Sequence, residues 1–476
     1  MLRDITPFRI INGLYYIGDS KDASHLLDTG AGLILIDTPR NPDSAEILKE
    51  NMEKLGFDVS NIKYIIVSHG HFDHWEGVPQ LVEWSGAETF LGEKDVHSRL
   101  GFHPDHLLSD GDEITLGGVT IKCLHTPGHT VGTMSFFFDV QEEGETFRAG
   151  MFGGAGINQV GKKYLDRNGL YYHQRGDFYR SIERLRLEKV DLVLGNHPGP
   201  VKLFDKSEKA KTMGFRAFVD PSEWERFLAR REELLDKLID NEQKELFVNY
   251  AHRGASTYCP ENTMLSFYTG MYMGANGIET DVRLTKDGVA VLFHDEALER
   301  VTNGTGKVCD HTYSELCEVD VIKGELKDKI PTLEDFLAHF SHRDITFAIE
   351  LKGENAEEIT ADLIRKYGIQ QKCIVTSFRF PYLEKMHEIA PELKLGYLVS
   401  SFTDETFAKM KRIGCDEFCP KAALITEDAV RAWHRAGFRV RAWGVSDESV
   451  MERLVACGVD GMTVNFPDKL TAHLQK

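Results

Sequence analysis

The amino-acid sequence has no apolar run that approaches the ~20 residues of a membrane-spanning helix. Its first residues, MLRDITPFRIINGLYYIG, lack the basic start and apolar stretch that are typical of a secretory signal. No Lys- or Arg-rich stretch offsets the formal net charge of −19, which argues against nucleic acid or an anionic membrane surface as a partner. We therefore expect a cytoplasmic protein without stable membrane insertion, in which metal ions attract any anionic substrate.

Paired cysteines at the spacing of a zinc or redox motif are also lacking. The cysteines lie at positions 123, 259, 309, 317, 373, 415, 419 and 457, and none forms a C-x-x-C pair. Free thiols in a reducing compartment fit this distribution best. Cys415 and Cys419 could form half of a zinc site, but no second pair accompanies them, so we favour buried core cysteines.

Low-complexity tracts and internal repeats are absent too. Because single hydrophobic cores stop growing at ~250–300 residues, a chain of 476 residues predicts two domains. Short β-branched runs separated by turns continue to about residue 200 and predict a strand-rich, layered domain. The sequence then changes to a helical pattern over residues 221–245, and we place the boundary at its end, which gives domains 1–243 and 244–476.

Strands and helices alternate after this boundary. Apolar segments such as LFVNYAH, GIETDV and DITFAIEL are separated by amphipathic helical segments, and eight such strands follow one another. This alternation predicts a closed (β/α)8 barrel of parallel strands, the TIM-barrel architecture. The expected fold class is therefore α/β, with two domains.

Ionisable side chains follow the first two strands of the expected barrel. His252 and Arg253 end the first strand. Glu279 and Asp281 stand two positions apart on the second, so both carboxylates lie on one face of an extended chain. Since catalytic groups of such barrels lie at the C-terminal ends of strands, we expect these side chains to share one site.

Two later segments bring further polar groups to the same place. The connection at residues 283–288 is too short for a parallel crossover and predicts a hairpin, which brings His294 beside Asp281. A later strand carries Glu350 and Lys352, again two positions apart on one face.

Together these residue types predict phosphodiester hydrolysis. Three carboxylates from two strands are oxygen ligands for a hard divalent cation such as Ca²⁺ or Mg²⁺. Arg253 and Lys352 can hold the remaining phosphate oxygens, and His252 and His294 are placed as general base and general acid. The metal neutralises charge on the phosphoryl oxygens, one imidazole removes a proton from the attacking hydroxyl, and the other protonates the leaving alkoxide.

These motifs resemble the glycerophosphodiester phosphodiesterase family. The matching stretches, in order, are HRGAS, PENT, ETDV, LTKDG, HDEALERVTNGTG, IPTLEDF, ELK and GVDGMTVNFPD. The resemblance implies a small-molecule glycerophosphodiester substrate that is cleaved to glycerol 3-phosphate and an alcohol. Attack by the neighbouring glycerol hydroxyl would form a cyclic phosphate before water opens it. The resemblance assigns acid/base roles to His252 and His294, metal ligation to Glu279, Asp281 and Glu350, and phosphate contacts to Arg253 and Lys352.

The N-terminal half has its own group of metal-binding residue types. The strand IKYIIVS is followed by H-G-H-F-D-H at residues 69–74. Two histidines two positions apart, followed by an acid and a third histidine, are ligands that can divide between two neighbouring metals. His129 lies in a Pro-Gly turn and His197 follows another strand.

This order of motifs resembles the metallo-β-lactamase superfamily, whose fold is an αββα sandwich. The resemblance implies two Zn²⁺ ions with a hydroxide between them, and hence a second hydrolase. It assigns one zinc to His69, His71 and His129, and the other to Asp73, His74 and His197. Many superfamily hydrolases also carry a bridging aspartate after a Gly, but this chain has Gly150 and Met151 in that region and no acid nearby. In this respect it is similar to the β-lactamase-like branch.

Two hypotheses follow for the N-terminal domain. It is either a hydrolase fused to the phosphodiesterase or a non-catalytic binding or assembly module. Its substrate, the alcohol part of the diester and homo-oligomerisation are left open. Several side chains also keep two interpretations. They are Phe378 and Trp443 (barrel packing or substrate platform), His103, His106 and His125 (solvent-exposed or behind the metal ligands), and Tyr171, Tyr172 and His173 (helix flank or pocket mouth).

Overall fold

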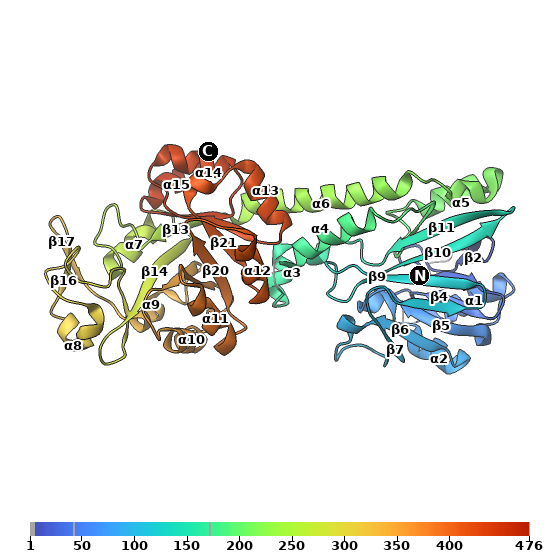
Figure 1. Ribbon diagram of the computed structural model, residues 1–476, viewed down its shortest axis with the longest axis horizontal. Helices are drawn as coiled ribbons and strands as arrows, with labels where there is room; N and C mark the ends of the chain where they lie inside the picture. The colour runs from blue at the N-terminus through green and yellow to red at the C-terminus, as the bar shows by residue number, and fades with distance from the viewer. Residues whose placement is uncertain (1–4, 41–42, 171–172, 476) are drawn as a thin grey trace. The chain divides into compact units, whose positions relative to one another are not determined.

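The computed structural model describes residues 5–40, 43–170 and 173–475, and the chain folds into two compact units (Figure 1). Unit 1 runs to Tyr164 and resumes from Gln174 to Leu238. Unit 2 takes in Leu165–His173 and everything from Ile239 onward. None of the described helices is long and apolar enough to cross a bilayer.

Unit 1 contains two β-sheets. The first has the strand order β1 (Phe8–Ile11), β2 (Leu14–Tyr16), β3 (His25–Asp28), β4 (Leu33–Ile36), β5 (Ile62–Val67), β6 (Glu88–Gly92), β7 (His106–Leu108). The second has the order β12 (Leu192–Gly195), β11 (Glu145–Phe152), β10 (Met134–Glu142), β9 (Val119–His125), β8 (Glu113–Leu116). The helices of this part of the chain are α1 (Ser44–Lys54), α2 (Val78–Ser85), α3 (Lys162–Arg167), α4 (His173–Leu185), α5 (Leu203–Met213) and α6 (Glu223–Leu246). The last residues of α3 and α6 and the first residue of α4 belong to unit 2.

Helices cover one face of each sheet, which gives the expected αββα sandwich. Leu48 of α1 and Leu81 of α2 belong to the same buried cluster as Ile65 of β5. On the other sheet, the Trp224 ring of α6 lies 5.9 Å from the Phe137 ring of β10 in an edge-on arrangement. The amphipathic segment predicted at 221–245 is therefore α6, and its apolar stripe is buried against unit 1 at Trp224.

Unit 2 is a closed parallel barrel. Its strands, in spatial order, are β13 (Val248–His252), β23 (Gly461–Val464), β22 (Arg439–Ala442), β21 (Glu417–Pro420), β20 (Lys394–Val399), β19 (Cys373–Ser377), β18 (Thr346–Leu351) and β14 (Gly277–Leu284). Pairing of β13 with β14 closes the ring. The strands expected from the sequence are thus the strands of the barrel. Its helices are α7 (Met264–Tyr272), α9 (Leu333–Phe340), α10 (Glu357–Lys366), α11 (Phe380–Ile389), α12 (Asp404–Arg412), α13 (Glu427–Arg435), α14 (Glu448–Ala456) and α15 (Pro467–Leu474).

A hairpin interrupts the alternation after β14, as the short connection predicts. Strand β15 (Ala290–Leu292) returns antiparallel to β14, with Leu284 opposite Ala290 and Val282 opposite Leu292. The chain then forms α8 (Tyr313–Leu316) and the hairpin of β16 (Asp320–Lys323) and β17 (Leu326–Lys329) before it enters α9.

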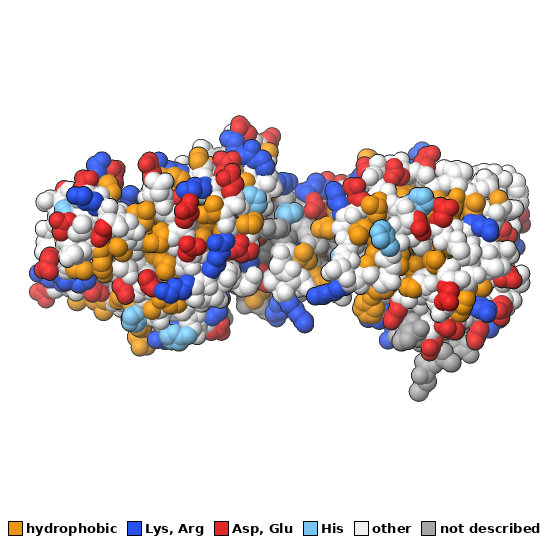
Figure 2. Space-filling model, turned by 90° about the horizontal axis from the view of Figure 1, so that it is seen from below, with side chains coloured by type: hydrophobic (Ala, Val, Ile, Leu, Met, Phe, Trp, Pro, Cys, Tyr) orange, Lys and Arg blue, Asp and Glu red, His pale blue; other side chains and the backbone are white. Residues whose placement is uncertain are grey.

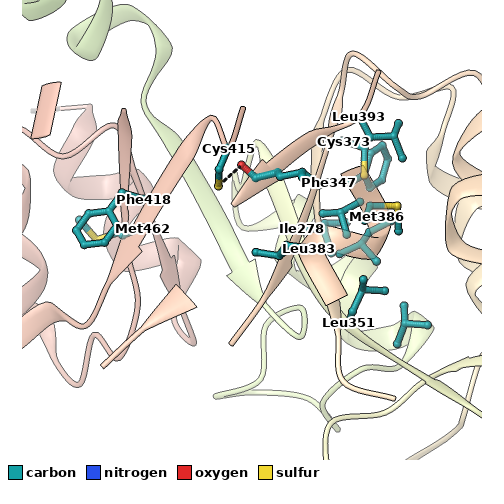
Figure 3. Close-up of a cluster of buried hydrophobic side chains, with 14 of the residues drawn as sticks. Ile278, Phe347, Leu351, Cys373, Leu383, Met386, Leu393, Cys415, Phe418 and Met462 are labelled. Carbon is teal, nitrogen blue, oxygen red and sulfur yellow. Dashed lines mark hydrogen bonds between the residues drawn. The ribbon is translucent and has the colours of Figure 1, made fainter. Parts of the chain in front are cut away.

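Apolar side chains fill the space between the barrel strands and the helices (Figure 3). Ile278 and Phe347 on neighbouring strands are fully buried, as are Leu383 and Met386 of α11. Cys415 belongs to this cluster and its Sγ lies 3.2 Å from the Leu395 carbonyl oxygen. Cys415 and Cys419 are both buried, which confirms the interpretation as core cysteines. On the surface, acidic and basic side chains are intermixed over the face seen in Figure 2.

A buried ion pair joins the neighbouring strands β21 and β22. Arg441 Nε lies 2.7 Å from Glu417 Oε2, and each side chain is only 1% exposed. The Arg441 guanidinium also lies 5.0 Å from the centre of the Tyr250 ring. A buried charge of this kind is tolerated only while its partner is present.

We predict that Arg441→Met destabilises the barrel, because it leaves Glu417 buried without a counter-charge. The free energy of opening of β21 and β22, measured by native-state hydrogen exchange, should fall by about 3–5 kcal/mol. Replacing both partners by apolar residues (Glu417→Leu with Arg441→Met) should cost clearly less. A double variant that is as unstable as the single one would show that the ion pair is not the cause.

Candidate metal centres

Three carboxylates meet at the C-terminal ends of two barrel strands. Asp281 of β14 stands directly opposite Glu350 of β18, and Glu279 stands opposite His252 of β13. Glu279, Asp281 and Glu350 are at most 5% exposed, and one oxygen of each lies within 4.8 Å of the others. The three residues predicted from the sequence to share a site are therefore adjacent.

The electrostatics of this cluster call for a cation. Burial and the charge of Asp281 raise the pKa of Glu279 to about 8 and that of Glu350 to about 7. Burial opposes ionisation of Asp281 as well, but Arg253 and Lys352 lower its pKa to about 2. Asp281 Oδ1 is buried without a hydrogen-bond partner among the described residues, and Glu350 Oε1 faces the Lys352 ammonium. Three crowded carboxylates with spare lone pairs are the ligand set of a hard divalent cation.

Arg253 is held over this cluster by an unusual backbone conformation. Its φ is +54°, in the left-handed region that non-glycine residues seldom adopt. This turn lets its amide N–H donate to Glu279 Oε2 (3.1 Å), and its Nε lies 3.2 Å from Asp281 Oδ2. Its Nη1 donates to Glu261 Oε1 at 2.8 Å. Backbone strain at such a position is typical of a site that other contacts hold in place.

The PENT motif supports the cluster in a way that sequence analysis did not assign. Asn262, also at positive φ (+55°), donates from Nδ2 to Asp281 Oδ2 at 2.9 Å and accepts from Thr280 Oγ1 at 2.8 Å. Glu261 bonds to Arg253 and to Arg300. These bonds fix the orientations of Asp281 and Arg253, which is the common role of residues behind a metal site.

The two predicted histidines lie beside the cluster, each with a partner that the sequence did not reveal. His252 Nε2 lies 3.9 Å from Glu279 Oε2, and its Nδ1 bonds to Asn465 Oδ1. Burial and Arg253 lower the pKa of His252 to about 4, so this imidazole is neutral near pH 7. His294 Nδ1 bonds to Asp295 Oδ1 at 2.6 Å. Burial also lowers the pKa of His294, although Asp281 and Asp295 oppose this effect.

Lys352 and two aromatic residues complete the site. Lys352 Nζ lies 2.7 Å from Glu350 Oε1 and 5.3 Å from the centre of the Phe378 ring. Phe378 in turn contacts Trp443 edge-on, with ring centres 4.9 Å apart. A cavity of about 280 Å³ is lined by both aromatics together with His252, Glu279, His294 and Lys352. The two aromatics therefore face the site cavity.

In unit 1, three imidazole nitrogens converge. His69 Nδ1 and His129 Nδ1 each donate to a backbone carbonyl, of Gly153 and Gly156 respectively, at 2.8 Å. Their Nε2 atoms must then carry lone pairs, yet they lie 3.1 Å apart, and His71 Nδ1 lies 3.1 Å from His129 Nε2. Burial lowers the pKa of His129 to about 3, which keeps its ring neutral. Converging imidazole lone pairs fit a cation such as Zn²⁺.

A second group lies next to the first. Ligand atoms of Asp73, His74 and His197 lie within 4.8 Å of one another. His74 Nδ1 is 2.9 Å from Asp37 Oδ2, and its buried Nε2 has no hydrogen-bond partner among the described residues. His197 Nδ1 bonds to the Lys21 carbonyl at 2.9 Å. The six predicted residues therefore form two adjacent groups, divided as the superfamily resemblance implied.

Carboxylates behind the histidines were missed by the sequence analysis. Asp37 directly follows β4 at a φ of +59° and accepts from both the backbone N–H and the Oγ of Ser68 at 2.7 Å. Asp22 Oδ1 lies 3.1 Å from His197 Nδ1. The only indication in the sequence was an acid at the end of the apolar run LILID, which is too common a pattern to assign.

The glycine-rich turn after β11 follows Gly150 and Met151, the positions without a bridging aspartate, which lie within the strand. A Cβ on Gly153 would lie 1.8 Å from the Met134 carbonyl oxygen, and one on Gly154 would lie 2.7 Å from His129 Cβ. Only glycine fits this close approach, which brings two backbone carbonyls to His69 and His129. Met151 itself is a buried residue of β11.

The other three histidines of unit 1 that the sequence analysis considered lie outside both groups. His125 Nε2 bonds to the Val131 carbonyl, His106 pairs with Glu88, and His103 Nδ1 lies 3.1 Å from the Pro104 carbonyl oxygen. Tyr171 and Tyr172 lie outside the described residues, and His173 begins α4.

Comparison with known proteins agrees with these geometries. The model of the glycerophosphoryl diester phosphodiesterase family matches residues 252–469. A glycerophosphodiester phosphodiesterase of Caldanaerobacter subterraneus is 34% identical over 235 residues, which are 48% of this chain and 97% of that protein. The chain belongs to the glycerophosphodiester phosphodiesterase family. The uncharacterized protein YqiK of Bacillus subtilis is 33% identical over 237 residues, 48% of this chain and 98% of that protein.

This member of the phosphodiesterase family carries a second domain. The model of the metallo-beta-lactamase superfamily matches residues 20–142. Among solved structures, the FEZ-1 metallo-beta-lactamase of Legionella gormanii is 27% identical, with a TM-score of 0.47, and the match covers 51% of this chain and 98% of that one. Given the family matches and the clustered ligands, the chain is a metal-dependent hydrolase that joins a metallo-β-lactamase domain to a glycerophosphodiester phosphodiesterase domain.

We predict that the metal-free protein loses stability as the pH rises from about 4.5 to about 8, compared with a Glu279→Gln variant. The folded pKa of Glu279, about 8, lies above its ordinary value of 4.5, so ionisation in this interval disfavours the folded state. Denaturant unfolding in the presence of a chelator, measured on both proteins across this range, checks the difference. Parallel pH profiles would contradict the proposed repulsion.

Proposed function

We propose that unit 2 hydrolyses glycerophosphodiesters to glycerol 3-phosphate and an alcohol. One Ca²⁺ or Mg²⁺ would be held by Glu279, Asp281 and Glu350, and the catalytic domain would span residues 244–476. The main support is the convergence of three buried carboxylates beside two imidazoles near strand ends of the barrel, with Asp281 Oδ1 lacking a hydrogen-bond partner among the described residues.

Each residue has a role that its contacts support. When bound, the divalent cation supplies positive charge beside the phosphoryl oxygens. Arg253 and Lys352 bind the other phosphate oxygens, because both cations already face the carboxylate cluster. His252, neutral because of its low pKa, accepts the proton of the attacking hydroxyl, and Asn465 holds its ring.

His294 acts as the general acid in this mechanism. Its proton passes to the leaving alkoxide oxygen. Burial lowers the pKa of His294, and the carboxylates of Asp281 and Asp295, the latter 2.6 Å from Nδ1, counter this effect and favour the protonated ring. Arg283 fixes this histidine by donating from Nε and Nη2 to its backbone carbonyl, at 3.0 and 2.8 Å. The attacking hydroxyl is that of the neighbouring glycerol carbon, so that a cyclic phosphate forms first and water then opens it.

We further propose that the N-terminal domain, residues 1–243, holds two Zn²⁺ ions. His69, His71 and His129 would hold one, and Asp73, His74 and His197 the other. The lone pairs of the first group face one another, which supports the view that this domain still binds metal. Two zinc ions held by these residues would lower the pKa of bound water and so provide a nucleophile near neutral pH, and we therefore favour hydrolysis by this domain over a purely binding or assembly role.

The barrel reaction should depend on unit 2 alone. We predict that His252→Ala lowers glycerol 3-phosphate release from glycerophosphocholine by about 10²–10⁴-fold, the usual contribution of a general base. His71→Ala, which alters only the zinc site, should keep wild-type activity. Loss of activity in both variants would show that the domains are not independent.

The zinc content should depend on the N-terminal histidines and Asp73. We predict two zinc ions per chain by elemental analysis of the purified protein, and loss of both metals' tight binding in the His71→Ala/Asp73→Ala variant, because each substitution removes a ligand from one group. His106→Ala, an exposed histidine of the same domain, is the control and should keep both ions. A wild-type chain without tightly bound transition metal would favour the binding-module hypothesis.

A further inference from the structure

A second cavity opens beside the phosphodiester site. It has a volume of about 560 Å³ and is lined by the C-terminal ends of β14 and β18, the start of α11 and the segment after β15. Lys352 lines this cavity and also the cavity that contains the metal-ligand cluster. A substrate whose phosphate lies at Lys352 can therefore extend one of its two arms into each cavity.

The two cavities differ in chemistry. The one at the metal cluster is bounded by the apolar side chains of Phe378, Leu398 and Trp443. The second, which we call the basic cavity, is lined by the cations Arg283, Lys286, Lys352 and Arg379 and by the acids Glu296 and Glu354. Cations thus exceed acids in a chain whose net charge is −19.

Some of these charged side chains already form hydrogen bonds or ion pairs within the protein. Arg283 donates to the His294 carbonyl, Lys352 faces Glu350, and Glu296 lies 2.7 Å from Lys307. Lys286 and Arg379 differ from them, because neither forms an ion pair with a carboxylate in the described part of the chain.

Arg379 is also held in place. Its guanidinium carbon lies 5.7 Å from the centre of the Tyr382 ring, and its Nη1 lies 3.5 Å from the Tyr382 hydroxyl. An arginine oriented by an aromatic ring loses less conformational freedom when it binds an anion. The fork of N–H groups then matches the geometry of a carboxylate or a phosphate.

We propose that the basic cavity binds an anionic group on the alcohol part of the diester, so that the enzyme prefers glycerophosphodiesters whose head group carries a carboxylate or a second phosphate. The uncharged glycerol part then occupies the apolar side of the metal-site cavity. Lys286 and Arg379 determine this specificity and take no part in bond cleavage. The proposal rests on the phosphodiesterase function proposed above.

A series of substrates that differ in one terminal group tests the proposal. Glycerophosphodiesters of 1-propanol, 3-hydroxypropionate and ethylene glycol monophosphate present a methyl, a carboxylate and a phosphate group. At low ionic strength we expect kcat/KM for the charged substrates to exceed that for the propyl diester by about tenfold, which corresponds to about 1.4 kcal/mol from two cationic contacts. The carboxylate and phosphate arms show which anion is preferred.

The variant Lys286→Gln/Arg379→Gln should reduce this preference to near unity and leave hydrolysis of the propyl diester unchanged. The matched control is Lys327→Gln/Arg431→Gln, which removes the same charge from exposed positions that do not line the basic cavity. The control should keep the preference, and added salt should weaken it in the wild type. A wild type that shows no preference, or a control that loses it equally, would overturn the proposal.

A binding measurement separates this proposal from the proposed activity. Calorimetric titration with ethylene glycol monophosphate in the presence of Ca²⁺ needs no turnover. We expect the Lys286→Gln/Arg379→Gln variant to bind it about tenfold more weakly than the wild type and the control variant. If none of the diesters is hydrolysed but this difference is found, the proposed activity fails and the anion site stands. Equal affinities in all three proteins would refute the anion site.

Discussion

Groups that repel one another are buried together at both centres of this protein. In the barrel, Glu279, Asp281 and Glu350 lie within 4.8 Å of one another in an environment that disfavours their charges. In the sandwich domain, the Nε2 lone pairs of His69 and His129 face each other at 3.1 Å. A cation relieves both conflicts, and without one the folded state carries their full cost.

The surrounding structure maintains these arrangements. Asp37 holds His74, Asn262 holds Asp281, and both of these supporting residues adopt a positive φ. Backbone strain therefore occurs immediately beside the ligands in both domains, and rigid strands on either side keep it in place. The result is a set of donor atoms that are oriented before a metal or substrate arrives, which reduces the cost of binding.

Much of this could be predicted from the sequence. The barrel strands have long apolar runs, and the residues two positions apart on them, such as Glu350 and Lys352, necessarily share a face. The H-G-H-F-D-H motif likewise gathers imidazoles and a carboxylate in one short turn, a density of ligand atoms that core packing seldom produces. Strand β11 has no long apolar run, because a glycine and polar residues interrupt its apolar positions.

The residues that orient the candidate ligands could not be predicted from the sequence. Asp37 and Asn465 are separated from their histidines by 37 and 213 positions, so only the folded chain brings them together. The sequence was equally compatible with Phe378 and Trp443 packing in the barrel core or lining the site. Only the fold shows that they line the cavity. Short-range patterns thus indicated the candidate ligands, whereas the groups that orient them depend on tertiary structure.

The most direct test is anomalous diffraction from crystals of the whole chain, recorded at the zinc edge and after soaking in Mn²⁺ as a stand-in for Ca²⁺ or Mg²⁺. We predict two zinc peaks in the sandwich domain, at the two histidine groups, and a manganese peak between Glu279, Asp281 and Glu350. A barrel without a peak at saturating Mn²⁺, in which Lys352 and Arg253 neutralise the carboxylates alone, would contradict the account.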